Sequence, residues 1–173
     1  MSQQHPRAHL GMLRAGNREL RIEGKALMAA TKRATATWSG NLFEGSGAVS
    51  TDSGVLKNQE MTWKARADEG NPKSSPEELI AAAHATCFAM AFANELSQAG
   101  FTPDRLDVTS TVSFGPKEGG GVKIHSSALT VNGTVPGISA DQFQQIANGA
   151  KTGCPVSSAL AGNVDITLEA TLA

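Results

Sequence analysis

The sequence lacks an excess of charge of either sign, since 15 Lys and Arg residues stand against 16 Asp and Glu residues, for a formal net charge of -1. A protein that binds nucleic acid needs a basic surface that displaces counterions from phosphates, and here the basic residues are scattered among acids. We therefore expect no nucleic-acid partner. Because 40% of the residues are hydrophobic and 18% are charged, the composition disfavours disorder except at the ends.

Long hydrophobic runs are also missing. The longest uncharged run of the alanine-rich segment covers residues 79–94 and includes His84 and Thr86. It is shorter and more polar than the ~20 apolar residues of a membrane helix. The N-terminus carries dispersed Arg and His residues without the apolar core of a secretory signal. The sequence thus predicts a cytoplasmic protein that does not span a membrane.

Cysteine is scarce, with only Cys87 and Cys154 in 173 residues. A chain of this length buries a sizeable core and needs no disulfide to hold it together, and cytosolic thiols are kept reduced. The two cysteines and the four histidines are dispersed and form no HExxH or CxxC pattern, so we expect no metal site. Ser157 and Ser158 do not lie in a GxSxG motif, so nothing supports a serine hydrolase.

The chain divides into an N-terminal extension, residues 1–31, and one domain, residues 32–173. The extension has no clean hydrophobic period. It is interpreted either as carrying a short helix around residues 14–22 or as preceding a true start at Met28.

The domain shows strand-like and helical patterns in an order typical of an α+β fold with largely antiparallel pairing. The expected elements are a three-stranded meander from Arg33 to Arg66, a helix from Pro76 to about Gln98, a hairpin of residues 106–114 and 122–131, a helix from Ser139 to Gly153, a helical turn at 156–160 and a last strand at 164–172.

The first long helix is the best-marked element. Ser75 is a typical N-cap residue, Pro76 suits the first helical position, Glu77 and Glu78 suit the first turn, and Gly100 suits the end. The residues that follow Glu78 are apolar or small almost all round the helix. We expect such a helix to be buried on most faces, within one chain or in a dimer.

Cys87 lies in the middle of this helix, and taken alone it is most simply a buried core residue. Cys154 differs, because it stands at a helix end between Gly153 and Pro155, where a sulfur can face a pocket. The pair together suggests redox chemistry. A reactive thiol must ionise near neutral pH although an ordinary cysteine has a pKa of ~8.5, and a neighbouring guanidinium lowers that value.

Arg66 is the candidate guanidinium, and Glu77 is its candidate carboxylate partner in a bidentate pair; Arg33 and Arg105 are alternatives. Glu77 and Cys87 lie about 15 Å apart on one helix at ~1.5 Å per residue, so they cannot touch within it. Either Glu77 merely interacts with the helix dipole, or it meets the Cys87 of a second subunit. The second interpretation predicts a dimer with composite sites.

Seven segments carry a recognisable pattern: residues 38–40, 47–51, 53–56, 76–90, 99–103, 135–138 and 150–157. In these segments residues 32–173 resemble the OsmC/Ohr family of organic hydroperoxide reductases. The two cysteine motifs, at 76–90 and 150–157, are the specific ones. His84 places the sequence on the OsmC side of the family.

The resemblance implies an intertwined homodimer with antiparallel sheets packed around two central helices. It also implies a peroxidase without metal or organic cofactor. Cys87 would attack an organic hydroperoxide, and Cys154 would then form a disulfide with it. Arg66 would lower the pKa of Cys87 and Glu77 would orient Arg66. An external dithiol, of the lipoyl type, would reduce the disulfide.

The leading hypothesis is therefore a thiol peroxidase in oxidative stress defence. Two alternatives stay open: a thiol-based redox sensor or small-ligand-binding protein of the same fold, and a structural dimer with two inert cysteines. His84 is interpreted as a buried helix histidine satisfied by a backbone or side-chain partner. Phe88 and Met90, close to Cys87, would favour organic over hydrogen peroxide, although they also suit a plain core.

Overall fold

A computed structural model describes residues 21–22, 25–26 and 30–173. The chain forms two compact units, Met1–Arg33 and Ala34–Ala173. In the first unit, β1 (Arg21–Ile22) pairs with β2 (Lys25–Ala26) in an antiparallel arrangement. The short helix expected around residues 14–22 lies outside the described residues except for its last two, which form β1 instead. Met28 also lies outside them.

The second unit begins with an antiparallel meander, which confirms the three strands expected before Arg66. Its strands are β3 (Ala34–Ser39), β4 (Ser46–Thr51) and β5 (Gln59–Thr62), in the order β3-β4-β5. Gly47 pairs with Trp38, and a Cβ there would lie 2.8 Å from the indole ring. A glycine is therefore required where the Trp38 side chain crosses the neighbouring strand.

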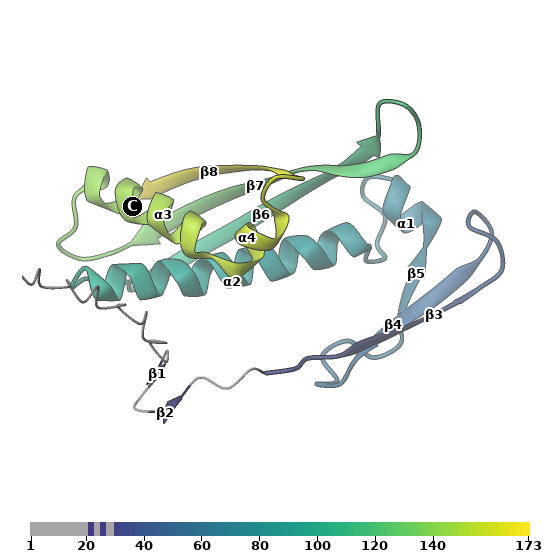
Figure 1. Cartoon of the computed structure of the whole chain (residues 1–173), viewed down its shortest axis with the longest axis horizontal. Helices are drawn as coiled ribbons and strands as arrows, with labels where there is room; N and C mark the ends of the chain where they lie inside the picture. Colours follow the sequence, from purple (N-terminus) through teal and green to yellow (C-terminus); the bar gives the residue numbers. More distant parts are fainter. Residues whose placement is uncertain (1–20, 23–24, 27–29) are drawn as a thin grey trace, which may run out of the picture. The chain divides into compact units, whose positions relative to one another are not determined.

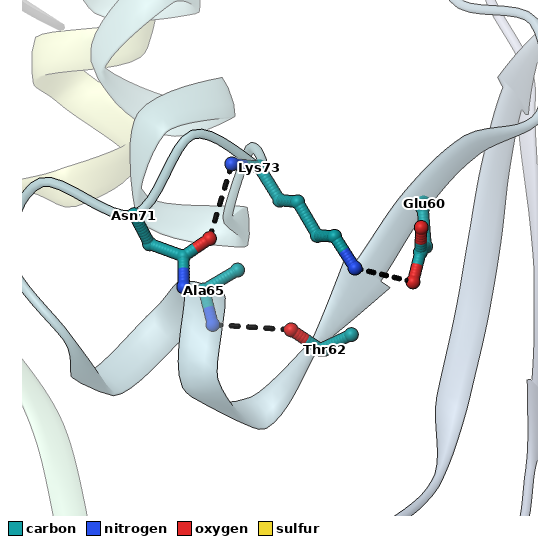
Figure 2. Close-up of polar contacts among 5 residues, drawn as sticks. All are labelled: Glu60, Thr62, Ala65, Asn71 and Lys73. Atoms are coloured by element: carbon teal, nitrogen blue, oxygen red, sulfur yellow. Dashed lines mark hydrogen bonds and ion pairs between the residues drawn. The ribbon is translucent and has the colours of Figure 1, made fainter.

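The expectation that Trp63 to Arg66 end the third strand was wrong, because these residues form a short helix, α1 (Trp63–Ala67). Thr62 caps it: its Oγ1 accepts a hydrogen bond from the backbone N–H of Ala65 at 3.1 Å (Figure 2). A side-chain acceptor at the N-cap satisfies one of the free N–H groups of a first turn. The cap therefore ends β5 at Thr62 and places Arg66 on α1 instead of on the strand.

The loop after α1 returns to β5. Lys73 donates from its Nζ to Glu60 Oε1 at 2.6 Å, and its backbone N–H donates to Asn71 Oδ1 at 3.1 Å (Figure 2). The pair of Lys73 and Glu60 is exposed and therefore contributes little stability. Its effect is to fix the path of the chain before the next helix.

The long helix α2 (Pro76–Gln98) has the bounds that the sequence predicts. The Ser75 hydroxyl accepts from the backbone N–H of Glu78 at 3.2 Å, and Gly100 follows the helix with a φ of 87°. Among the described residues, α2 is the one helix with the length and composition to cross a membrane, a property that it shares with the core helices of soluble proteins. It is longer than the uncharged run on which the sequence argument rested.

The second sheet has the order β6-β7-β8, with strands β6 (Arg105–Pro116), β7 (Val122–Thr134) and β8 (Asp165–Leu172). The first two form the expected hairpin. The last strand pairs with β7 in parallel, because α3 (Ala140–Gly153) and α4 (Pro155–Leu160) form a crossover between them. The fold is α+β as expected, with antiparallel pairing everywhere except at this one strand pair in the second unit.

The core lies between this sheet and the helices, as α2 runs along one face of the sheet with α3 beside it (Figure 1). Phe92 of α2 packs against Phe88 at 5.8 Å and Phe143 of α3 at 4.9 Å between ring centroids. All three rings are buried. Within this chain α2 is buried on one face only, since Met90 on the opposite face is 64% exposed.

Candidate active site

Cys87 and Cys154 come from different elements of the second unit. Cys87 lies in the middle of α2 and is half-buried. Cys154 is fully buried and ends α3 while it begins α4, with φ -71° and ψ 120°. Pro155 cannot continue α3 but suits the first position of α4. This break turns the Cys154 side chain inward toward α2.

The two thiols are free, and each shifts the pKa of the other. Burial raises the pKa of the Cys87 thiol, the backbone N–H of Val156 opposes this effect, and Cys154 raises the pKa further. Burial also acts to raise the pKa of Cys154. There, hydrogen bonds from the backbone and hydroxyl of Ser157, from Cys87 and from the Val156 backbone hold the pKa below its ordinary value. Within one chain, Cys154 is thus the more readily ionised sulfur.

Arg66 and Glu77 form an ion pair at the N-terminal end of α2. The Nε and Nη2 atoms of Arg66 lie 2.9 and 2.8 Å from Glu77 Oε1. Both donors contact the same oxygen, so the expected two-oxygen bidentate geometry is not formed. Glu77 Oε2 is buried and has no hydrogen-bond partner among the described residues.

The guanidinium of Arg66 also stacks over an aromatic ring. Its Cζ lies 4.3 Å from the centroid of Phe114, a distance at which a cation is attracted to the face of a ring. The side chain of Arg66 is 32% exposed, so solvent or a partner can still reach it. The pair with Glu77 and the ring of Phe114 together fix its direction.

The pairs Arg66–Glu77 and Cys87–Cys154 occupy different places along α2. The groups that shift the pKa of Cys87 are its burial, Val156 and Cys154, and no arginine of the described residues is among them. Arg105, an alternative arginine, is exposed and engages Asp107 through contacts of 2.7 to 2.9 Å. Within this chain, Arg66 and Arg105 thus each pair with a carboxylate, Glu77 and Asp107 respectively.

An apolar pocket of about 430 Å³ lies beside Arg66. Trp38, Leu42 and Trp63 line it together with Arg66 and Pro76. Trp63 also contacts Phe43 and Phe114 edge to face, with ring centroids 5.6 and 6.4 Å apart. A pocket of this kind, apolar with one cation at its border, suits a molecule with an alkyl or aryl body and a polar end.

His84 is fully buried, and its side-chain partners agree with the expectation for a satisfied helix histidine. One partner, Ser157, also bonds to Cys154, a link that the sequence reasoning missed. The signal was its position one helical turn after Cys154 at the start of a proline-initiated helix. Phe88, expected near Cys87 as a selectivity residue, is part of the core.

The structure thus combines an α+β fold with two thiols, one on the central helix α2 and one on the crossover between β7 and β8. Proteins of known family share this chain's sequence and fold. Residues 68–169 match the family described as OsmC-like protein. The chain is 45% identical to the peroxiredoxin OsmC of Escherichia coli (strain K12) over 142 residues, 82% of this chain and 96% of that protein. It is 33% identical to the organic hydroperoxide resistance protein OhrB of Bacillus subtilis (strain 168) over 71% of this chain and 88% of the relative.

Solved structures agree. The crystal structure of OhrB from Bacillus subtilis is similar with a TM-score of 0.65 at 31% identity, and covers 80% of this chain and 98% of that one. An organic hydroperoxide resistance protein from Elizabethkingia anophelis has a TM-score of 0.66 at 26% identity, over 84% and 100% of the two chains. The chain belongs to the OsmC-like family.

Proposed function

We propose that this chain is a cytoplasmic, thiol-dependent peroxidase that reduces organic hydroperoxides to alcohols in oxidative stress defence. The observation that carries the proposal is the pairing of Cys87 with Cys154, in which each thiol shifts the pKa of the other. The relatives named peroxiredoxin and organic hydroperoxide resistance protein support the same activity. Catalysis by thiols requires no prosthetic group.

The reaction has two steps on the protein. The Cys87 thiolate attacks the distal oxygen of the hydroperoxide, the O–O bond breaks, and the alkoxide takes a proton and leaves as the alcohol. Cys87 is now a sulfenic acid, the first level of the thiol oxidation ladder. The Cys154 thiolate attacks its sulfur, a disulfide forms, and the hydroxide leaves as water after it takes a proton.

The disulfide is returned to two thiols by an external dithiol of the lipoyl type. Such a reductant forms a mixed disulfide first and then closes its own ring as it releases the protein thiol. Two electrons pass from the dithiol to the protein in each cycle. These electrons replace the two that the peroxide removed.

Activation of Cys87 requires a cation that the described residues of one chain do not place beside it, and we assign this role to Arg66 of a second copy. Burial raises the pKa of Cys87, whereas a guanidinium in contact with the sulfur would lower it. Glu77 is buried and holds Arg66 through its Oε1. Each active site of the homodimer would then combine Cys87 and Cys154 of one copy with Arg66 and Glu77 of the other.

The exposed surfaces of the chain favour such a dimer. The middle of the free face of α2 is mostly apolar or small, with exposed Ala82, Ala83 and Met90 around the polar Thr86. The outer face of the β6-β7-β8 sheet is polar instead, with exposed Thr109 and Thr167 at its centre. Apolar surface that one chain leaves open is commonly covered by a partner. The α2 face is therefore where the second copy would pack.

The apolar pocket beside Arg66 would receive the organic group of the substrate. Its walls include two tryptophans, Trp38 and Trp63, which offer large apolar surfaces. Hydrogen peroxide would gain nothing from these walls, because it has no apolar part to bury. The enzyme should therefore prefer bulky hydroperoxides, through their apolar contact with the pocket.

The test follows cumene hydroperoxide consumption with dihydrolipoamide, and counts free thiols before and after one equivalent of peroxide. Wild type should turn over and lose two thiols per chain. Cys87→Ser should be inactive, whereas Cys154→Ser should react once and stop. If Cys87→Ser consumes peroxide as fast as wild type, the proposal is wrong. A stable disulfide without turnover would indicate a redox sensor instead.

A further inference from the structure

A chain of buried hydrogen bonds leads across the core toward Cys154. Ser110 Oγ of β6 lies 3.0 Å from Ser127 Oγ of β7, which lies 2.7 Å from His84 Nδ1. The other ring nitrogen, Nε2, lies 2.8 Å from Ser157 Oγ of α4. Ser157 stands one helical turn after Cys154, and its hydroxyl and backbone lower the pKa of the Cys154 thiol. Four elements thus contribute to one connected polar path inside an apolar core.

The path is buried from Ser127 to Cys154, and Ser110 at its start is partly buried. His84 and Ser127 are fully buried and Ser157 is 4% exposed. Burial lowers the pKa of His84, so the imidazole is neutral near pH 7. A neutral imidazole has one donor and one acceptor nitrogen, so its two serine partners must play opposite roles. A buried polar group without a hydrogen-bond partner is costly, and His84, Ser127 and Ser157 each have one.

The role of Cys154 fixes the direction of the path. A thiolate only accepts, so the Ser157 hydroxyl must donate to Cys154, and Ser157 Oγ is then free to accept from His84 Nε2–H. His84 Nδ1 accordingly accepts from the Ser127 hydroxyl. The donors all point toward the sulfur, and such aligned hydrogen bonds polarise one another.

The solvent exposure of the two sulfurs also distinguishes their roles. Cys154 is 0% exposed, whereas Cys87 is half-buried. In the single chain, the sulfur of Cys87 is therefore the more accessible of the two to an external reductant. Three titratable groups of α2 lie near Cys154: Cys87, His84 and Glu95. The Glu95 carboxylate lies beside Gly153, the residue before Cys154. On α3, Lys151 lies in the last turn.

We propose that His84 is a positioning residue which, through Ser157, aims a hydroxyl proton at Cys154 Sγ and makes Cys154 the leaving group of the disulfide. The inference rests on the proposed disulfide cycle. The donor thiolate attacks Cys87 Sγ, the Cys87–Cys154 bond breaks, and its electron pair stays on Cys154 as a thiolate held by Ser157. The same hydrogen bond favours the thiolate form of Cys154 for its attack on the sulfenic acid of Cys87.

The decisive experiment measures how fast dihydrolipoamide reduces a disulfide that has been formed beforehand with diamide, a non-peroxide oxidant. Ser157→Ala should slow this reduction about tenfold, the effect of losing one hydrogen bond to a charged group. Ser158→Ala is the matched control, because Ser158 is the next residue of α4 and is exposed. Its rate should equal that of wild type.

A second readout separates positioning from mere folding. In a Cys87→Ser background, the ultraviolet absorbance of the thiolate reports the ionisation of Cys154 as the pH rises. Adding Ser157→Ala or His84→Leu should move this titration to higher pH, and His84→Gln, which keeps one amide donor, should move it less. Thermal unfolding of each variant shows whether it is folded at the temperature of the assay.

The inference is overturned if folded Ser157→Ala reduces its disulfide at the wild-type rate and leaves the Cys154 titration in place. The proposed peroxidase function fails separately, through loss of peroxide consumption, since neither of these two measurements uses a peroxide. If both measurements give the expected results but the protein does not consume peroxides, the role of His84 is supported and the proposed peroxidase activity is wrong.

Discussion

The middle of α2 and its N-terminal end differ in how completely the single chain surrounds them. Around Cys87 and Cys154, α3, α4 and the β6-β7-β8 sheet supply a partner for each polar side chain of the path from Ser110. Around Arg66, the pocket walls are open and Glu77 Oε2 has no partner among the described residues. The redox pair is therefore complete within one chain, whereas the region around Arg66 would be completed by the second copy proposed above.

The largest effect should come from Phe92, which lies in the core that the single chain encloses between α2, α3 and the second sheet. Phe92→Ala removes a fully buried ring and should lower the free energy of unfolding by about 3–5 kcal/mol. Leu42→Ala, at the open pocket and 49% exposed, should cost far less in dilute protein. Urea unfolding measures both. If Phe92→Ala and Leu42→Ala lowered the free energy of unfolding equally at every protein concentration, the two regions would not differ as described.

The second prediction tests whether the site is shared between chains. Arg66→Gln should lower peroxidase activity about 10²-fold, as loss of one charge-stabilising donor does. Cys87→Ser should be inactive. An equal mixture of the two, allowed to exchange subunits, should regain about a quarter of wild-type activity, because a symmetric heterodimer has one site with neither change. If activity does not return although subunits exchange, Arg66 and Cys87 do not act across an interface.

A third, smaller effect concerns the open face of α2. Met90→Glu places a charge on the exposed apolar side of the helix and should weaken self-association about tenfold, since an unpaired charge is costly in an apolar interface. Thr167→Glu, on the outer face of the second sheet, is the control and should change nothing. Sedimentation at several protein concentrations measures both. Equal weakening by both changes would contradict the assignment of the face.

The smallest effect is a pH dependence of stability. Because the folded chain holds the pKa of His84 below its ordinary value of 6.5, the unfolded chain takes up the proton first as the pH falls. Stability should therefore decrease as the pH falls below about 6.5, and level off once the folded pKa is passed. His84→Gln should lose this part of the dependence. Parallel unfolding curves for both proteins across this range would argue against a neutral, buried imidazole.

Local chemistry explains how much of the fold the sequence could predict. Ser75 with Pro76 and Ser139 with Gln142 are caps whose partners lie within the same turn, so both helix starts could be read directly. The strand predicted at Trp63 failed because Thr62 can equally extend a strand or cap a helix. Only the rest of the structure decides between the two.

The candidate site was predictable for the residues that carry a motif, and not for those that act through long-range contacts. Cys87 and Cys154 stand in distinctive local sequences, and Arg66 was matched to Glu77 by charge. Ser127 carries no such signal, because its role depends on the register of β7 against α2. A serine on a strand becomes part of a polar path only when the helix places a histidine above it.

Cys154 lies in the crossover between two parallel strands, while Cys87 lies on the helix beneath the sheet. A disulfide between them closes a loop that contains the whole β6-β7 hairpin and α3. Cross-links that close loops of this size restrict the unfolded chain by about 4 kcal/mol. In the proposed cycle, oxidation by a peroxide would therefore stabilise the fold, and reduction by a dithiol would reverse that gain. The resistance of the protein to proteolysis would then report its recent exposure to oxidant.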